Sequence, residues 1–279
     1  MTSHNATILV GYDGSPDADS ALQWAAETSV LEGHDVRAVI VDDGTSPTDG
    51  PPHQDPPSEM VAKVEAVLTG AGASGVAERH GRDEGDVESI LLQEATDADM
   101  LVVGGRAHGR VGAVLGSLSQ HLLGHAECPV VVVRGAVGSE ADRIVVGVDG
   151  SEESIAALRF ACRRASVTEE PVVALHAWNA GHVQLDHRGQ LPDEVGARSV
   201  KAAAVLDESV AGVQLDYPAV TIEEELVAMP PAEALVEASA NASLVVTGSR
   251  GRGALAGLLL GSVSHHVVRL GQCPVAVVR

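Results

Sequence analysis

Short apolar runs alternate along this chain with longer stretches in which apolar residues recur at helical spacing. The runs are rich in valine, isoleucine and leucine and end near glycine or aspartate, which is typical of buried parallel strands followed by tight turns. In the first half this pattern predicts strands from Ile8, at 36–41, 76–80, 101–104 and 130–134, and helices from Ser20, at 59–68, at 87–95 and after Gly116-Ser117. In the second half it predicts strands from Ile144, at 172–178, 220–225, 244–246 and 275–279, and helices around Leu158, at 194–210, at 232–240 and after Gly261-Ser262, the last capped by Gly271.

The two halves repeat the same phrases in the same order. Residues 8–15 have the sequence ILVGYDGS, and 136 residues later residues 144–151 have the sequence IVVGVDGS. A second apolar phrase returns after 144 residues, and Gly-Ser followed by Cys-Pro-Val returns after 145 residues. Three ordered matches with slowly growing offsets indicate a duplicated domain. We therefore expect a first domain at 1–134, a linker at 135–142 and a second domain at 143–279.

Strands and helices alternate within each half, and this order specifies a fold class. We predict an α/β fold of two repeated doubly wound domains, each a five-stranded parallel sheet with helices on both faces, in the Rossmann-like manner. Such sheets bind ligands beyond the carboxyl ends of their strands, where the strand order reverses. Asp13 and Asp149 follow the first strands, and glycine-rich loops follow the fourth strands. If those strands are neighbours, each aspartate faces its glycine-rich loop across one crevice.

Composition narrows the classes of function. Of the 279 residues 45% are hydrophobic but only 2% aromatic, which favours aliphatic cores between helices and a sheet. The chain carries 18 Lys and Arg against 39 Asp and Glu, a formal net charge of −21, and it has no basic run. We therefore expect neither nucleic acid nor a membrane as a partner. Three scattered cysteines and the lack of a leader-like N-terminal pattern predict a cytoplasmic location.

The strongest chemical signal follows the fourth strand of the second half. Gly248-Ser249-Arg250-Gly251 leaves a buried strand, and nine residues after Gly251 the pair Gly261-Ser262 opens a helix. Free N–H groups and the positive end of a helix dipole suit phosphate. Because the net charge repels anions, a phosphate ligand needs a locally positive pocket, which Arg250 and Arg252 can supply. The alternative is that both arginines are solvated surface charges.

This spacing is more specific than a lone glycine turn. The order of strand, G-x-x-G, nine residues, G-S, helix, Cys-Pro and last strand resembles the ATP-binding branch of the universal stress protein family, whose pattern is G-2x-G-9x-G-(S/T). Gly248, Gly251, Gly261 and Ser262 match that pattern at every position. The resemblance implies a tandem two-domain form of the family with ATP, with or without Mg²⁺, as its ligand.

The resemblance also implies how an adenine nucleotide lies in the second half. The adenosine part would lie beside Asp149, since a carboxylate suits hydroxyl and amino donors, and the phosphates would lie at the glycine-rich loop. The alternative for Asp149-Gly150-Ser151 is a turn that caps the next helix. The candidate nucleotide-binding residues are Gly147, Asp149, Ala177, Gly248, Ser249, Arg250, Gly251, Arg252, Gly253, Gly261, Ser262, Val263 and Ser264.

The first half departs from the pattern at its loop. Ala107 stands where the second glycine should be, and only eight residues separate Ala107 from Gly116. A loop shorter by one residue shifts its N–H groups by up to ~3.5 Å. Either the loop adapts or this half binds weakly or not at all, so we expect binding mainly in the second half. The first-half candidates are Gly11, Asp13, Val41, Gly104, Gly105, Arg106, Gly109, Gly116, Ser117 and Ser119.

The cysteines and histidines favour simpler interpretations than chemistry. Cys128 and Cys273 each precede Pro-Val before the last strand of a half, and no His/Cys ligand spacing surrounds them, so we expect buried small apolar side chains. His121, His125 and the pair His265-His266 lack an HExxH pattern or a third ligand. We expect no metal site and no catalytic residue.

Three functions remain open at this stage. The resemblance implies an ATP-binding regulator of stress response or growth state. A slow ATP hydrolase is the second possibility, but residues 248–264 contain no carboxylate and no P-loop lysine, so we do not predict an enzyme. The third is a scaffold with a vestigial first site. In the family the last strands join two domains, which implies that the halves pair with pseudo-twofold symmetry and that the tandem chain forms a homodimer.

Overall fold

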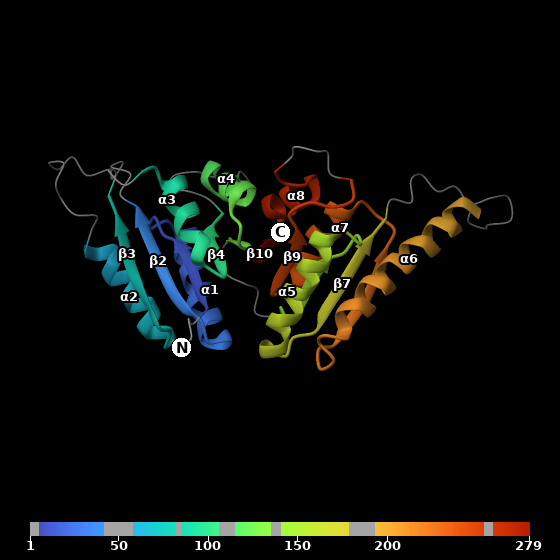
Figure 1. Cartoon of the computed structure of the whole chain (residues 1–279), viewed down its shortest axis with the longest axis horizontal. Coiled ribbons are helices and arrows are strands. Elements are labelled where there is room, and N and C mark those ends of the chain that lie inside the picture. The colour runs from blue at the N-terminus through green and yellow to red at the C-terminus, as the bar shows by residue number, and fades with distance from the viewer. Residues whose placement is uncertain are drawn as a thin grey trace. The chain divides into compact units, whose positions relative to one another are not determined.

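The computed structural model describes residues 6–41, 58–81, 85–105, 115–134, 141–178, 193–253 and 259–279. The chain divides into two compact units, Met1–Ala136 and Val137–Arg279, and each has parallel strands flanked by helices (Figure 1). The predicted α/β class with two Rossmann-like domains is confirmed. The expected linker falls largely outside the described residues. No helix in the described ranges is long and apolar enough to span a membrane.

The first unit alternates strand and helix throughout. Its strands are all parallel and lie in the order β3-β2-β1-β4-β5, so that β1 pairs with both β2 and β4. Helices α1 and α2 pack on one face and α3 and α4 on the other (Figure 1). The elements are β1 (Thr7–Gly11), α1 (Pro16–Glu32), β2 (Asp35–Val41), α2 (Ser58–Ala71), β3 (Gly75–His80), α3 (Val87–Glu94), β4 (Met100–Gly104), α4 (Ser117–His125) and β5 (Val130–Val133).

The second unit repeats this topology. Its parallel strands lie in the order β10-β9-β6-β7-β8, with β6 paired to both β7 and β9. Helices α5 and α6 pack on one face and α7 and α8 on the other. The elements are β6 (Ile144–Gly147), α5 (Glu152–Thr168), β7 (Val172–Ala177), α6 (Asp193–Gln214), β8 (Ile222–Val227), α7 (Pro231–Ala238), β9 (Leu244–Gly248), α8 (Ser262–Leu270) and β10 (Val275–Val278).

The core of each unit is aliphatic, as the composition predicts. The central strands are buried on both faces because helices cover both sides; Leu9, Leu101, Val146 and Leu244, for example, are fully buried. These strands therefore have continuous apolar sequences rather than alternating ones. The burial fixes where their carboxyl ends lie, and thereby positions the loops that follow them.

Two predicted boundaries are wrong in detail, whereas the predicted Gly271 cap is confirmed. The helix expected from Ser20 is α1 and begins at Pro16, after Ser15, whose side chain caps it. The strand expected at 220–225 is β8 at Ile222–Val227, because Val220 belongs to the preceding turn, where its N–H donates to Tyr217 O at 3.1 Å. Gly271 does end α8, but with φ of −58° rather than in the left-handed conformation that a glycine cap suggests. A Cβ at Gly271 would lie 2.8 Å from Val267 O, so close packing rather than backbone conformation favours glycine there.

Candidate functional site

A cavity of about 460 Å³ lies at the carboxyl ends of the second unit's strands. Strand order reverses at β6, whose partners are β7 on one side and β9 on the other. This is the place where open α/β sheets bind ligands. Eleven of the thirteen residues expected in the second half line the cavity: Gly147, Asp149, Ala177, Gly248, Arg250, Gly251, Gly253, Gly261, Ser262, Val263 and Ser264.

The two remaining candidates lie beside the cavity without lining it. Ser249 is 1% exposed, and its backbone N–H donates to Val278 O at 2.6 Å. Arg252 contributes its backbone N–H to the site, but its guanidinium lies next to Gly150, where a Cβ would be 3.2 Å from Nη2. Of the two arginines expected to supply positive charge, Arg250 alone lines the cavity.

The turn after β6 places Asp149 at the cavity. Gly150 has φ of +76°, a conformation that favours glycine, and Ser151 begins α5 by accepting the Ser154 N–H on its Oγ at 3.2 Å. Asp149 Oδ1 accepts from the Ser151 N–H at 3.0 Å and from the Ser151 hydroxyl at 2.5 Å. The expected alternative of a helix-capping turn is thus part of the geometry, with Ser151 as the cap and Asp149 supporting it.

The second oxygen of Asp149 holds the glycine-rich loop. Its Oδ2 accepts the backbone N–H of Arg252 at 2.8 Å, and a Cβ at Gly251 would lie 2.3 Å from the same oxygen. Burial by itself would raise the pKa of Asp149, but hydrogen bonds from Ser151, the Arg252 backbone and Ser154 outweigh it and lower that pKa below its usual value. The carboxylate is therefore ionised at neutral pH, and glycine at position 251 is required for its approach to the loop.

The start of α8 faces the cavity with its backbone. The first residue of the helix is Ser262, and Gly261 before it provides no side-chain cap. Gly261 is held in place by its N–H, which donates to Ser249 O at 2.7 Å. The Ser264 hydroxyl donates to Gly248 O at 2.6 Å, so it ties the helix to the end of β9. Ser262, Val263 and Ser264 of the first turn line the cavity, and the N–H groups at the start of a helix have no partner within the helix, which is the arrangement that binds anions.

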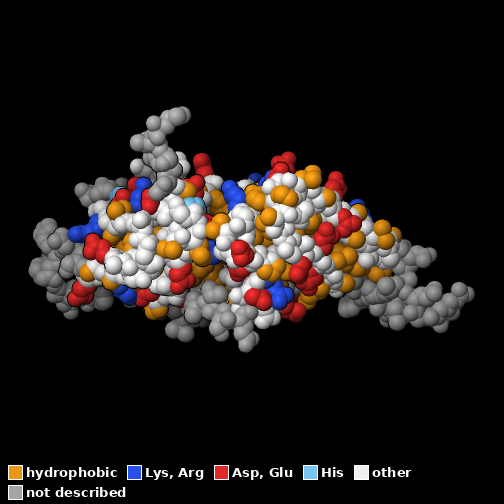
Figure 2. Space-filling view, turned by 90° about the horizontal axis from the view of Figure 1, so that it is seen from below, with side chains coloured by type: hydrophobic (Ala, Val, Ile, Leu, Met, Phe, Trp, Pro, Cys, Tyr) orange, Lys and Arg blue, Asp and Glu red, His pale blue; other side chains and the backbone are white. Residues whose placement is uncertain are grey.

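Charges around this site are mixed. Arg250 pairs with Glu153 at 3.3 Å, and their side chains are 50% and 25% exposed. Elsewhere on the molecule, the face seen from below in Figure 2 has acidic side chains at several places rather than in one patch. The local positive charge at the cavity therefore comes from the α8 N-terminus and from an arginine that already has an acidic partner.

Six cavity residues were missed by sequence reasoning. Four of them have apolar side chains, and two add hydroxyl groups. The apolar residues are Val148, Leu175, Pro231 and Leu235, and the hydroxyl residues are Ser154 and Thr247. Leu175 could have been found, because it lies two residues before Ala177 on the same face of a strand. Pro231 and Leu235 lie one turn apart on α7, and nothing local in the sequence relates that helix to β6. A Cβ at Gly147 would lie 2.8 Å from Leu235 Cδ1, so a larger residue there would displace the Leu235 side chain from the cavity wall.

The first unit repeats part of this geometry. Asp13 Oδ1 accepts the Ser15 N–H at 2.9 Å, the Ser119 hydroxyl donates to Gly104 O at 3.0 Å, and Gly116 caps α4 without a side-chain contact. The Gly116 N–H donates to Gly105 O at 3.2 Å. Gly11 ends β1, Val41 ends β2 opposite His80, and Ser117 begins α4. Arg106 and Gly109 lie outside the described residues.

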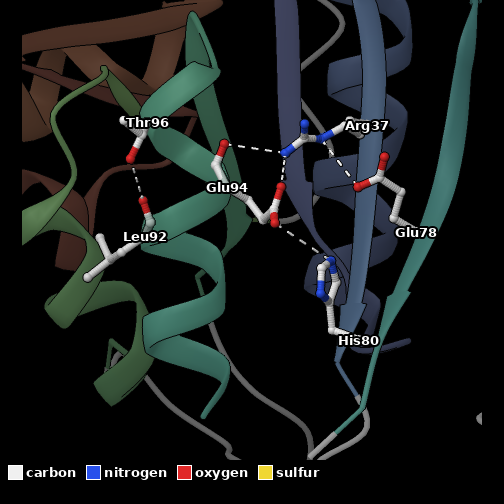
Figure 3. Close-up of polar contacts among 6 residues, drawn as sticks. All are labelled: Arg37, Glu78, His80, Leu92, Glu94 and Thr96. Carbon is white, nitrogen blue, oxygen red and sulfur yellow. Dashed lines mark hydrogen bonds and ion pairs between the residues drawn. The ribbon is translucent and has the colours of Figure 1, made fainter. Parts of the chain in front are cut away.

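A second polar cluster in the first unit contains possible metal ligands. Glu78, His80 and Glu94 each offer a donor atom within 4.8 Å of the others, and Arg37 lies among them (Figure 3). Arg37 pairs with Glu94 and, at 3.4 Å, with Glu78, whereas His80 Nε2 is 4.0 Å from Glu94 Oε1. The guanidinium already supplies positive charge to both carboxylates, so we interpret the cluster as an ion-pair network that joins α3 to β2 and β3.

The cysteines lie in the cores of the two units. Cys128, Cys162 and Cys273 are free and buried, which confirms the expectation of buried small side chains for Cys128 and Cys273. Burial raises the pKa of Cys128 and Cys162 to about 11 and that of Cys273 to about 12. Their thiols are therefore protonated and poorly nucleophilic at neutral pH.

Comparison with known proteins identifies relatives of both halves. The model of the universal stress protein family matches residues 4–134 and again residues 140–279. A universal stress protein of Mycobacterium tuberculosis (strain ATCC 25618 / H37Rv) is 36% identical over 299 residues, which cover 100% of this chain and 99% of the relative. One from Mycolicibacterium smegmatis is 34% identical over 293 residues, covering 98% of this chain and 96% of the relative. The crystal structure of a universal stress protein from Archaeoglobus fulgidus DSM 4304 matches 100% of this chain and 99% of its own, with a TM-score of 0.68 and 18% identity.

Proposed function

The chain belongs to the universal stress protein family and carries the family's domain twice, and on this premise we propose that its second half binds an adenine nucleotide, ATP in the first place. In this proposal the protein regulates the stress response or the growth state, and its regulatory activity depends on whether the nucleotide is bound. The observation that carries the proposal is the convergence of the Asp149 carboxylate, the glycine-rich loop and the α8 N-terminus on one cavity of about 460 Å³.

The residues of the cavity fit the two ends of a nucleotide. Leu175, Ala177, Pro231 and Leu235 supply an apolar wall suited to a base. The loop glycines and the first turn of α8 supply backbone N–H groups suited to phosphate. Among the residues that the structure describes, none lies within 4 Å of a Cβ built at Gly253 on this loop. An Asp149 carboxylate between the two ends suits ribose hydroxyls or amino groups, not phosphate.

ATP would supply the charged phosphate tail, and the chain would supply its orientation. The N–H groups at the start of α8 hold the phosphates, and Arg250 adds positive charge when its pairing with Glu153 is shared. Mg²⁺ prefers oxygen ligands and retains water, so an accompanying ion would be held mainly by the phosphates themselves. The proposal includes a cytoplasmic location, where ATP is abundant and thiols remain reduced.

We propose binding rather than turnover. Hydrolysis needs a group that orients the attacking water and a metal held at the phosphates. Asp149 is the cavity's carboxylate, and both of its oxygens accept hydrogen bonds from the turn and the loop. Phosphate release well above the uncatalysed background, abolished by Asp149→Ala, would establish the alternative of a slow hydrolase.

A titration of ATP into the full chain tests the proposal, with Gly253→Glu as the diagnostic variant. The new carboxylate would meet no described residue within 4 Å of its Cβ, and it would repel phosphate held by the loop. Gly212→Glu is the matched control, because Gly212 also has open space around it and lies on the exposed surface of α6, away from the cavity.

We expect saturable binding by the wild-type chain and by Gly212→Glu, and roughly 5- to 30-fold weaker binding by Gly253→Glu, since one like charge at close range in a partly enclosed site costs on the order of 1–2 kcal/mol. No saturation at millimolar ATP in the wild type would refute nucleotide binding. Equal affinity of the two glutamate variants would remove the loop from the site.

The assembly of the chain is part of the proposal as well. The resemblance implies a homodimer of the tandem chain, and the family's pairing of last strands is the support for it. Sedimentation equilibrium at high protein concentration should give a mass above that of one 28.6 kDa chain. A monomer mass under these conditions would exclude the homodimer while leaving nucleotide binding unaffected.

A further inference from the structure

Thr247 carries a buried hydroxyl that makes no hydrogen bond within the described part of the chain. The residue is 3% exposed and lies one position before the end of β9. Its Oγ1 has no hydrogen-bond partner among the residues that the structure describes. Nearby polar groups are already engaged, since Ser264 donates to Gly248 O and the Ser249 N–H donates to Val278 O. Buried hydroxyls are rarely left in this condition, because losing water without gaining a partner is unfavourable.

The fold itself does not require a hydroxyl at this position. In the first half Val103 occupies the corresponding place, one residue before the glycine that ends β4, and it pairs with Gly11 of β1. Valine has nearly the shape of threonine and would leave no polar atom without a partner. Threonine in the second half stands where valine serves the same fold in the first, so its hydroxyl is free of a structural role among the described residues and is available to a ligand of the cavity.

The cavity is where that partner can enter. Thr247 lines it together with Gly147, Leu175 and Leu235. Val246 pairs with Val146, so Thr247 lies beside Gly147, two residues before Asp149 and roughly 7 Å deeper along the strand direction. Thr247 therefore lies deeper in the cavity than Asp149, beside the apolar side chains of Leu175 and Leu235.

We propose that Thr247 is a specificity-determining residue whose hydroxyl forms a hydrogen bond with a ring nitrogen or an exocyclic amino group of the bound base. This inference rests on the proposed nucleotide binding of the second half and adds to it how the base is chosen. A hydroxyl can donate to a ring nitrogen or accept from an amino group, whereas the leucines around it can only pack. A site with a buried polar group discriminates against ligand analogues that lack the hydrogen-bonding partner of that group, because the group is then left unpaired.

The experiment compares Thr247→Val with Thr247→Ser in the full chain. The first variant removes the hydroxyl and keeps the shape, and the second keeps the hydroxyl and removes the methyl group. Affinities are measured by titration calorimetry for ATP, for the 1-, 3- and 7-deaza analogues in which one ring nitrogen is replaced by a C–H group, and for the analogue without the exocyclic amino group.

We expect Thr247→Val to bind ATP about three- to tenfold more weakly, the range that one hydrogen bond contributes, and Thr247→Ser to bind nearly as the wild type does. For one of the four analogues, the affinity of the wild type should be as low as the affinity of Thr247→Val for ATP. Thr247→Val should bind that analogue and ATP with equal affinity. Unchanged ATP affinity of Thr247→Val would overturn the inference, as would equal losses in both variants, which indicate packing of the methyl group alone.

Thermal unfolding without nucleotide provides a reading that is independent of binding. Thr247→Val should be at least as stable as the wild type, because it removes a buried hydroxyl that has no partner among the described residues. A clear drop in its melting temperature would mean that the hydroxyl serves the fold, and would contradict the inference. If the wild type does not bind ATP, the proposed function is refuted. If the wild type and Thr247→Val bind ATP with equal affinity, only the role of Thr247 is refuted.

Discussion

The contact between Asp149 and the glycine-rich loop makes Gly251 sensitive to a single methyl group. A Cβ at position 251 would lie 2.3 Å from Asp149 Oδ2, inside the 3.0 Å below which real Cβ contacts essentially do not occur. Either the carboxylate or the loop must move, and the hydrogen bond from the Arg252 N–H to Oδ2, 2.8 Å long, is lost with that movement. Gly251→Ala therefore moves the Asp149 carboxylate and the glycine-rich loop apart.

The magnitude follows from the kind of bond that is broken. Hydrogen bonds to a charged acceptor contribute about 1.5–3 kcal/mol, which corresponds to a factor of roughly 10 to 150 in an equilibrium constant. We expect Gly251→Ala to weaken ATP binding within that range, measured by titration calorimetry, and to lower the free energy of unfolding in urea by up to about the same amount.

Gly212→Ala is the control for this prediction. It adds the same methyl group where nothing lies within 4 Å, on α6, and a helical alanine is favoured over glycine by about 1 kcal/mol. Its ATP affinity should equal that of the wild type and its stability should rise. If Gly251→Ala bound ATP as tightly as Gly212→Ala, the contact between Asp149 and the loop would be irrelevant to the site.

Three further predictions concern titration, reactivity and the ion-pair cluster. The pKa of Asp149 is lowered in the folded protein, so its contribution to stability is complete above the ordinary aspartate pKa of 3.8 and is lost as the pH falls through the folded-state pKa. The stability difference between wild type and Asp149→Asn, measured by urea unfolding, should thus be constant near neutrality and shrink in acid; a difference that grows in acid would contradict the assignment. The three buried cysteines should react with a thiol reagent at pH 8 only in denaturant, because burial raises their pKa to about 11 or above, and rapid labelling of the native chain would show that a thiol is accessible. Arg37→Met should lower the free energy of unfolding by about 1–3 kcal/mol, since Glu78 and Glu94 lose their shared cation. Added Zn²⁺ should restore part of this stability, and it should stabilise the variant more than the wild type. An unchanged urea midpoint for Arg37→Met would show that the cluster does not stabilise the fold.

The fold could be predicted because its determinants are local and occur twice. Valine-rich runs followed by glycine define the buried strands, and the match between residues 8–15 and 144–151 defines the repeat. Boundaries failed where burial did not decide them. Strand β8 carries three exposed glutamates, Glu223 to Glu225, so its sequence has no apolar run to mark its limits.

The part of the candidate site that depends on glycine, aspartate and serine residues near the backbone could be predicted from the sequence. Gly251 and Gly261 reveal close approach and an uncapped helix start, and the structure brings both to one cavity. The apolar wall could not be predicted, because Leu235 reaches the cavity from α7 through tertiary packing that no local spacing encodes. Thr247 escaped notice for a related reason: in a strand it resembles a valine, and only its burial without a partner sets it apart.

A structure of the full chain with a non-hydrolysable ATP analogue is the most direct test of the account. The account predicts density in the second half, with phosphate oxygens about 2.7–3.2 Å from backbone nitrogens of the glycine-rich loop and of the first turn of α8, and with the base against Leu175 and Leu235. Density for the analogue outside this cavity, or phosphates placed against the apolar wall, would contradict it.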